Sequence, residues 1–265
     1  MTEAHDLERR FGGLRRLYGE VGYERLRALR VAVVGLGGVG SWTAEALARC
    51  GVAALILVDL DHVAESNINR QVQALGSTLG QHKGAALAAR IGDIHPGCAV
   101  QVIDAFVEEG NWPDLLQGQP IDALVDACDQ SAAKQLLASW ALQAGLPFVC
   151  VGAAGGKRLP HRVRAADLAD ATHDPLLAGL RSRLRRAGLM PRKGLSGLDC
   201  VYSEEGVAAP QGDASCASDG SLNCAGYGSV VTVTAAFGLA AAGLCIERAL
   251  VDRSRDSSPD SSKVL

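Results

Sequence analysis

The fold of this chain is decided by one stretch, Val31-Ala32-Val33-Val34-Gly35-Leu36-Gly37-Gly38-Val39-Gly40. A short apolar run rich in β-branched residues and bounded by glycine is typical of a buried parallel strand. The glycines permit a tight turn and let backbone N–H groups approach a phosphate, and the following helix N-terminus adds partial positive charge. Asp59 lies about twenty residues further on, where a carboxylate can accept from ribose hydroxyls. The segment predicts a nucleotide site, and by itself it fits NAD, FAD or ATP.

The alternation of strand and helix continues through the first 150 residues. Apolar runs recur at 54–58, 99–103, 123–125 and 147–151, and segments of helical period lie between them at 39–50, 80–94 and 130–144. Strands that alternate with helices imply right-handed βαβ units and a parallel sheet covered on both faces. We therefore predict an α/β, doubly wound, Rossmann-like parallel sheet. Residues 155–172 and 174–187 add mixed strands and a helix, and a long apolar helix follows.

The predicted domain organisation has three parts. They are an N-terminal helical arm with a Gly12-Gly13 interruption (1–30), an ATP-binding adenylation domain (31–250) and a tail rich in Ser, Asp and Arg that we expect to be disordered (251–265).

Composition excludes several classes of protein. Of the 265 residues 48% are hydrophobic and 21% charged, which excludes a wholly disordered or fibrous chain. The 26 Lys and Arg residues against 29 Asp and Glu argue neither for nor against a nucleic-acid ligand, so any basic patch must be local. The eight cysteines form no Cys-x-x-Cys pair, so the spacing of a four-cysteine zinc site is absent, and most of the cysteines fit small apolar residues in a reducing cytosol. The first thirty residues carry charges throughout, so we expect a cytoplasmic protein.

The apolar stretch 230–246 raises the question of a membrane. A spanning helix needs roughly 20 apolar residues, and this stretch is bounded by Ser229 and by Glu247-Arg248. Gly238 and Gly243 would allow close packing against a sheet or a partner helix. The pattern favours a buried or dimer-interface helix over membrane association through 230–246.

Polar residues follow the second and fourth strands. The connection from Asp59 to Gln71 leaves the carboxyl end of the second strand, where ligands bind in such sheets, and Lys83 begins the next helix. Cleavage of a triphosphate needs cations such as Arg70 and Lys83 to stabilise negative charge, whereas a dinucleotide dehydrogenase does not. Asp126-Ala127-Cys128-Asp129 places a carboxylate where it could hold Mg²⁺.

These motifs occur in a recognisable order: the glycine turn, Asp59-x-Asp61, Asn67-x-Asn69-Arg70-Gln71, Lys83 and Asp126-x-x-Asp129. The order resembles the adenylation domain of the ubiquitin-activating-like (ThiF-like) superfamily, whose bacterial members activate carboxylates as acyl adenylates. Four further segments resemble the branch that dehydrates threonylcarbamoyladenosine in tRNA: residues 10–19, 40–42, 152–156 and 198–203. The sulfur-carrier adenylyltransferase branch usually carries two Cys-x-x-Cys pairs, and this chain has none.

The resemblance implies a role for each matching residue. ATP and Mg²⁺ would be the cofactors. Residues that would bind the nucleotide are Gly35, Gly37, Gly38, Gly40, Asp59, Asp61, Asn67, Arg70 and Lys83. Arg70, Lys83 and Asp129 would be catalytic, with Asp129 as the Mg²⁺ ligand. The resemblance also implies a homodimer in which an N-terminal arginine, Arg10, Arg15 or Arg16, reaches the partner's phosphates. A cysteine desulfurase or sulfur-acceptor system stays open as a further partner.

The implied reaction adenylates the threonyl carboxylate and then lets an atom of the same modified base expel AMP. Because the second step is intramolecular, proximity alone can contribute roughly 7–11 kcal/mol, and no enzyme nucleophile is obligatory. Cys200 is the position to test for covalent catalysis, and the role of Cys224 stays open.

A tRNA ligand requires local positive charge. Six basic residues lie within a segment that contains no acid: Arg181, Arg183, Arg185, Arg186, Arg192 and Lys193. A solvated helix face is the ordinary explanation of such a run. Since the resemblance implies tRNA, and no DNA, as the polyanionic substrate, we predict that these residues contact tRNA.

Three alternatives remain from the sequence. An adenylyltransferase acting on the C-terminal glycine of a sulfur-carrier protein would share every ATP residue. An NAD-dependent Rossmann oxidoreductase fits the glycine turn and Asp59 but leaves Arg70, Lys83 and Asp129 without a role. A non-catalytic adaptor could retain the same fold.

Overall fold

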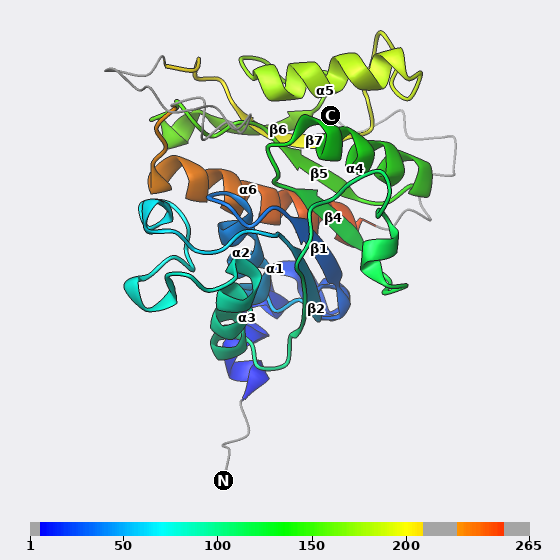
Figure 1. Cartoon of the computed structure of the whole chain (residues 1–265). Helices are drawn as coiled ribbons and strands as arrows, with labels where there is room; N and C mark the ends of the chain where they lie inside the picture. Colours follow the sequence, from blue (N-terminus) through cyan, green and yellow to red (C-terminus); the bar gives the residue numbers. More distant parts are fainter. Residues whose placement is uncertain (1–5, 209–226, 252–265) are drawn as a thin grey trace.

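The computed structural model describes residues 6–208 and 227–251, and a seven-stranded sheet forms its centre (Figure 1). The strand order is β3-β2-β1-β4-β5-β7-β6, with β6 antiparallel to β7 and every other pair parallel. The strands are β1 (Arg30–Val34), β2 (Ala54–Val58), β3 (Ala99–Ile103), β4 (Ala123–Asp126), β5 (Phe148–Val151), β6 (Val163–Asp167) and β7 (Asp199–Ser203). The predicted parallel sheet with mixed C-terminal strands is confirmed.

Helices cover both faces of this sheet. They are α1 (Leu7–Ala28), α2 (Gly40–Arg49), α3 (Lys83–Ile94), α4 (Ser131–Ala144), α5 (Pro175–Arg186) and α6 (Val231–Leu250). Alternate residues of β1 point to opposite faces: Val31 and Val33 pack with α2, α3 and α6, whereas Ala32 and Val34 share a core with α4 and α5. The strands are continuous apolar runs because both faces are buried.

The N-terminal arm differs from the prediction in one respect. The predicted interruption at Gly12-Gly13 is wrong, because α1 continues through both glycines and breaks at Gly19, whose φ is 71°. A glycine inside a helix costs about 1 kcal/mol relative to alanine, which is not enough to end it. Gly19 instead adopts the left-handed region that glycine tolerates. The predicted tail lies outside the described residues from 252 onward.

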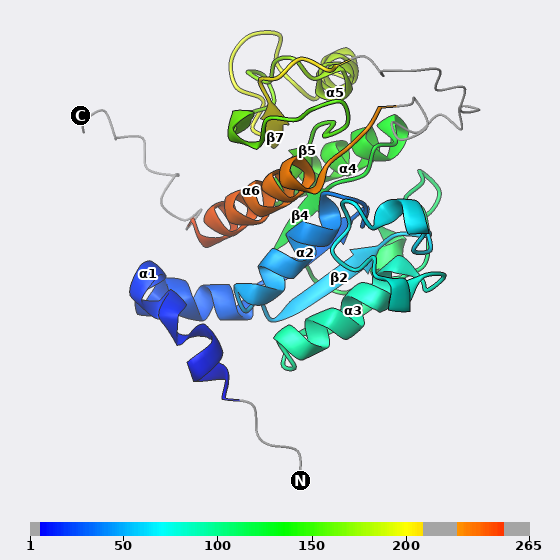
Figure 2. The ribbon, with the colours of Figure 1, turned by 90° about the vertical axis from the view of Figure 1, so that its left-hand side faces the viewer.

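The long apolar helix α6 lies alongside α2 (Figure 2). Among the described helices it is the one that is long and apolar enough to cross a membrane by length and composition. Its inner face, including Phe237 and Ala241, is part of the core. A Cβ atom on Gly238 would lie 2.6 Å from the Val39 carbonyl oxygen and 2.7 Å from Trp42 Cβ. Gly238 therefore permits the close packing that the sequence predicts, against α2 rather than against the sheet.

Two glycines of α6 give a matched test of this packing. We expect Gly238→Ala to lower the free energy of unfolding by about 1–3 kcal/mol, because backbone atoms of α2 occupy the space of the new methyl group. Gly243 has no atom within 4 Å of its Cβ position, so Gly243→Ala should leave stability unchanged or raise it by up to about 1 kcal/mol. Urea unfolding of both variants measures the difference, and equal stabilities would contradict the packing argument.

Candidate active site

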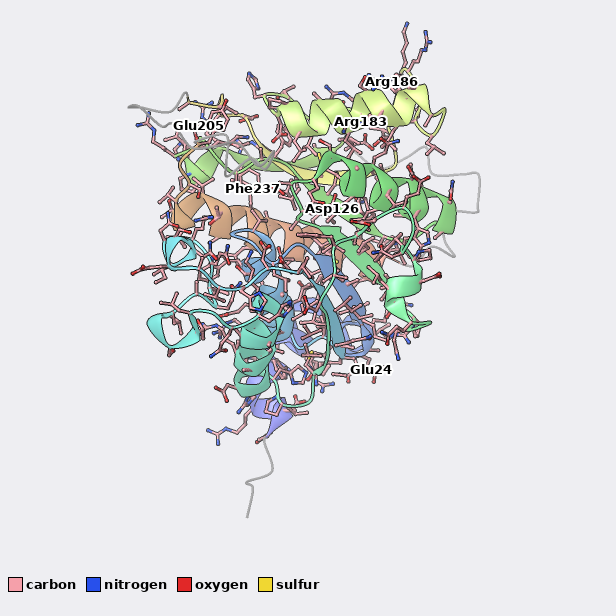
Figure 3. The ribbon with its side chains drawn as sticks, viewed as in Figure 1. Glu24, Asp126, Arg183, Arg186, Glu205 and Phe237 are labelled. Atoms are coloured by element: carbon pink, nitrogen blue, oxygen red, sulfur yellow. The ribbon has the colours of Figure 1, made fainter. Side chains whose placement is uncertain are left out.

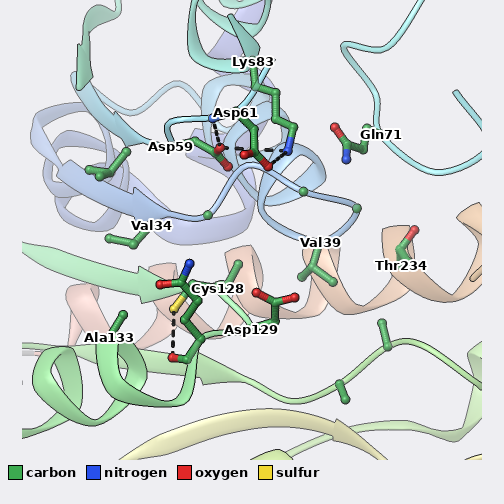
Figure 4. Close-up of a pocket in the computed structure, with 18 of the residues that line it drawn as sticks. Val34, Val39, Asp59, Asp61, Gln71, Lys83, Cys128, Asp129, Ala133 and Thr234 are labelled. Carbon is green, nitrogen blue, oxygen red and sulfur yellow. Dashed lines mark hydrogen bonds and ion pairs between the residues drawn. The ribbon is translucent and has the colours of Figure 1, made fainter. Parts of the chain in front are cut away.

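The carboxyl ends of β1, β2, β4 and β5 open into one pocket of about 610 Å³ (Figure 4). It lies where the strand order reverses, since the chain proceeds from β1 to β2 and β3 on one side and to β4 and β5 on the other. Open parallel sheets bind ligands at such a switch point. Of the predicted site residues, those that line the pocket are Gly35, Gly37, Gly38, Asp59, Asp61, Arg70, Lys83 and Asp129.

The glycine turn after β1 is packed too tightly for a side chain at two of its positions, Gly35 and Gly40. Gly35 has φ 85°, and a Cβ atom there would lie 2.8 Å from the backbone nitrogen of Cys128. A Cβ atom on Gly40 would overlap the carbonyl oxygen of Gly35. Gly40, predicted to bind the nucleotide, does not line the pocket; the structure places it where it lets α2 start directly against the turn. Gly37 and Gly38 are partly exposed and form the part of the turn that lines the pocket.

Asp59 joins this turn to the second strand. One carboxylate oxygen accepts from the backbone N–H of Leu36 at 2.6 Å, and the other accepts from the N–H of Asp61 at 2.9 Å. The Lys83 ammonium lies 2.6 Å from a carboxylate oxygen of Asp61 and 3.9 Å from one of Asp59. The predicted residues Asp59, Asp61 and Lys83 are therefore one cluster at the edge of the pocket (Figure 4).

Arg70 is a half-buried cation without an anion. Its guanidinium donates to the Ser66 carbonyl at 2.7 Å and to the Asn69 side-chain oxygen at 2.9 Å. Within residues 6–208 and 227–251 it makes no ion pair, and burial lowers the pKa of the group. Its stem packs over Gly38. A half-buried positive charge above a glycine turn suits a negatively charged ligand, because an unpaired charge is costly to bury.

Asn67 has a different place from the one predicted. Its side-chain oxygen accepts from the backbone N–H of Ala64 at 3.0 Å, and the residue is buried away from the pocket lining. Its side chain shapes the connection that carries Arg70 and does not line the pocket. Gln71, the last residue of the Asn67-x-Asn69-Arg70-Gln71 motif, does line the pocket.

The two carboxylates after β4 differ in their surroundings. Asp126 is fully buried and accepts from the Lys134 ammonium at 2.7 Å, so it is not available to a metal. Burial acts to lower the pKa of Lys134, and the adjacent Asp126 outweighs it, so the pKa is raised. Asp129 instead lines the pocket, opposite Asp59, Asp61 and Lys83 (Figure 4). Among the described residues no three His, Cys, Asp or Glu groups form a metal site.

The wall formed by residues 152–155 is held by a second buried ion pair that the sequence did not reveal. Asp174 accepts from the N–H groups of Ala153 at 2.8 Å and Leu177 at 3.0 Å, which also caps α5. The Lys157 ammonium lies 3.5 Å from Asp174, and neither side chain is exposed. Burial lowers the pKa of Lys157. The pair fixes the pocket wall to the start of α5.

None of the cysteines in the part of the chain that the structure describes has a lowered thiol pKa. Cys200 is buried in β7, and burial together with nearby carboxylates raises its pKa to about 12. Cys128 lines the pocket, but burial and Asp126 raise the pKa of its thiol well above the ordinary value. A nucleophilic cysteine needs a lowered pKa. Cys224 lies outside the described residues.

The predicted tRNA-contact segment divides into two groups. Arg181 donates to the carbonyls of Leu168 and Ala171, and Arg183 and Arg185 donate to the carbonyls of Ser131 and Pro191. These three arginines hold the structure around α5 together. The remaining three residues are exposed: Arg186, Arg192 and Lys193.

Comparison with known proteins gives a consistent result. The model of the ThiF family matches residues 11–255. The chain is 36% identical to the tRNA threonylcarbamoyladenosine dehydratase of Haemophilus influenzae, over 96% of this chain and 98% of that protein. It is 38% identical to the Escherichia coli protein of the same name, over 93% and 95%. The solved structure of the Escherichia coli tRNA N6-threonylcarbamoyladenosine dehydratase in complex with ATP superposes with a TM-score of 0.83, at 36% identity and with 94% and 97% coverage.

The unpaired charge of Arg70 gives a direct prediction about anion binding. We expect Arg70→Gln to weaken Mg-ATP binding by about 1.5–3 kcal/mol, roughly 10- to 100-fold in Kd, since charge-assisted hydrogen bonds are lost. Thermal stability should not fall, because the substitution relieves a buried charge. Calorimetry measures both quantities. Arg49→Gln, at the far end of α2 and paired with Glu45, is the control, and an equal loss of affinity in both variants would contradict the assignment.

Proposed function

This chain belongs to the ThiF family, and from that membership we propose that it is an ATP-dependent tRNA threonylcarbamoyladenosine dehydratase. It adenylates the threonyl carboxylate of the modified nucleoside and closes it into a ring with loss of water. The observation that carries the proposal is the coincidence of two facts. Relatives of this name match over nearly the whole chain, and one of them is solved with ATP. The pocket brings together a glycine turn, the Asp59 carboxylate at the end of β2 and Arg70, which makes no ion pair within the described residues.

The nucleotide is expected to span the pocket from β2 to β1. Asp59 would accept from the ribose hydroxyls, and Gly37 and Gly38 would let the phosphates approach the backbone. Arg70, which faces this turn, would contact the triphosphate. Lys83, held at 2.6 Å from Asp61, would add its positive charge to the binding of the triphosphate.

In the first step a carboxylate oxygen of the substrate attacks the α-phosphorus and pyrophosphate leaves. The phosphoryl oxygens carry the growing negative charge, so preorganised cations stabilise the transition state more than the ground state. Arg70 supplies such a charge without a competing carboxylate among the described residues. Attachment of AMP provides the leaving group that a carboxylate lacks.

In the second step an atom of the same modified base attacks the acyl carbon, and AMP leaves with the former carboxylate oxygen. The proton of the attacking atom is released to solvent. The reaction needs no thioester, which agrees with the raised thiol pKa values of Cys128 and Cys200. The pocket has only to hold the two groups together, since the ring closure is intramolecular.

Mg²⁺ is expected to be held by Asp129. Magnesium commonly takes one or two carboxylates together with substrate phosphates and water rather than an all-protein cage. Asp129 fits this pattern because it faces the pocket, whereas Asp126 is already paired with Lys134. When bound, the ion would neutralise charge on the triphosphate. Asp129 would position it from the β4 side.

We also propose that the protein acts as a homodimer. The outer face of α6 is apolar and includes Leu239, which is 54% exposed, and α1 exposes Leu17 and Val21. An apolar face of this kind suits a second copy of the chain. Of the three candidate N-terminal arginines, Arg10 donates to carbonyls at the end of α3 and Arg15 pairs with glutamates of α1. Arg16 is therefore our candidate for the partner's phosphates.

The function is tested by incubating tRNA that carries threonylcarbamoyladenosine with the purified protein and Mg-ATP. Mass analysis of the digested nucleosides should show the loss of one water, together with release of AMP and pyrophosphate. Omission of ATP, or its replacement by NAD, should abolish the change. Adenylation of a sulfur-carrier C-terminus with unchanged tRNA would contradict the proposal and favour the adenylyltransferase.

A second prediction concerns Cys200. We expect Cys200→Ala to retain most of the dehydratase activity, because the thiol is buried in β7 and its pKa of about 12 leaves it protonated at neutral pH. The small cavity should lower stability by about 1 kcal/mol. Activity is measured on the folded fraction, as judged by circular dichroism. Complete loss of turnover in a folded variant would indicate covalent catalysis.

A further inference from the structure

Positive charge is concentrated in one part of this chain. Residues 157–205 carry 10 Lys and Arg against 6 Asp and Glu, whereas the whole chain carries 26 against 29. This part contains β6, β7, α5 and the 3₁₀ turn η4 (Pro160–Arg162). The rest of the molecule is therefore acidic, and a polyanion would be attracted to this part.

Two exposed arginines of this part lie outside the segment around α5. They are Arg158, just before η4, and Arg162 at its end, next to the edge strand β6. Within residues 6–208 and 227–251 neither guanidinium makes a hydrogen bond or an ion pair. Arg164 on β6 differs, because Glu204 neutralises it at 3.3 Å.

The backbone that carries these arginines is held firmly. The Glu205 carboxylate accepts from the N–H groups of Arg158, at 2.9 and 3.1 Å, and of Leu159 at 2.8 Å. The Arg162 carbonyl accepts from the N–H of Glu204 at 3.1 Å. The preceding residue, Lys157, is buried, and η4 packs against α6. The fixed backbone keeps both arginines on this edge of the molecule, and their guanidinium groups have no partner in the described chain that would compete with a phosphate.

This surface adjoins the pocket. Gly155 lines the pocket three residues before Arg158, and the N–H of Gly156 donates to the Gly228 carbonyl, next to Ser229 of the pocket lining. The exposed basic residues at and beyond the end of α5 lie on the other side of the molecule. Glu205, which bonds the backbone of Arg158, and Arg186 at the end of α5 are far apart in Figure 3. Since Leu176 at the start of α5 lines the pocket, Arg186 is about 15 Å along the helix from it.

We propose that Arg158 and Arg162 bind phosphates of the tRNA backbone, as a second contact beside the pocket. Together with Arg186, Arg192 and Lys193 they flank the site from two sides, and that separation suits a polymer rather than a mononucleotide. This inference rests on the proposed function and adds the path of the RNA across the η4 edge. The contacts are with phosphates, so they position the RNA without reading its sequence.

The test compares Arg158→Gln/Arg162→Gln with Arg164→Gln, a matched control on the neighbouring strand whose charge is already neutralised. The Kd of full-length tRNA is measured by fluorescence anisotropy from 50 to 200 mM KCl. Two phosphate contacts contribute about 1.4–1.8 to the slope of log Kd against log salt concentration. The slope of the double variant should therefore be smaller by that amount, and its Kd for tRNA should be about tenfold higher. tRNA with and without the modified nucleoside should be affected equally. The Kd of Mg-ATP should stay at its wild-type value in both variants.

Three results would overturn the inference: an unchanged slope in the double variant, an equal change in Arg164→Gln, or an effect confined to the modified tRNA. Failure of the proposed function is distinguishable, because the binding series does not require turnover. If the wild-type protein binds tRNA but leaves its nucleosides unchanged, the function fails, and the salt slopes still decide whether Arg158 and Arg162 contact phosphate.

Discussion

The turn between β1 and α2 leaves no space for a side chain at Gly35 or at Gly40, and the rest of the site depends on that constraint. Gly35 passes against the backbone of Ala127 and Cys128, which fixes the loop after β4 relative to β1. The same turn offers the Leu36 N–H to Asp59, which fixes the end of β2. Three strand ends are thus held together by close backbone packing and by the side-chain carboxylate of Asp59. Groups that would bind the sugar, the phosphates and a metal ion reach one pocket because these loops cannot move apart.

The charges around the pocket follow a simple division. Three buried lysines each face a carboxylate: Lys83 pairs with Asp61, Lys134 with Asp126 and Lys157 with Asp174. The pairs of Lys134 and Lys157 are costly to separate, because both partners are buried and removal of one would leave an uncompensated charge. The three pairs hold the walls at α3, α4 and α5. Arg70 differs from these three lysines, because it is half-buried and makes no ion pair within the described residues, and its stem packs over the glycine turn. The fold therefore keeps one positive charge uncompensated where a phosphate is expected.

Sequence patterns predict the local features of this protein well. The apolar runs locate β1 to β5, and residues placed directly after strands, such as Asp59 and Asp129, do line the pocket, because carboxyl ends of parallel strands meet at one edge. Features that depend on distant partners are not predictable in this way. Nothing near Lys157 in sequence indicates Asp174, and the carbonyl partners of Arg181 are set only when α5 packs. The six basic residues of 181–193 look alike in sequence, but three of them, Arg181, Arg183 and Arg185, donate to backbone carbonyls of the protein itself.

The absence of a reactive thiol among the described residues is consistent with the chemistry of the substrate. An enzyme that transfers an acyl group to a separate acceptor must protect the activated acid, and a thioester is one means of doing so. A substrate that carries its own nucleophile needs no such intermediate, and Cys200 is instead part of the apolar core. The protein must instead hold a large RNA so that one nucleoside enters a pocket of about 610 Å³. Positive charge gathered around η4 and α5, in an otherwise acidic chain, meets that demand at a distance from the reacting atoms.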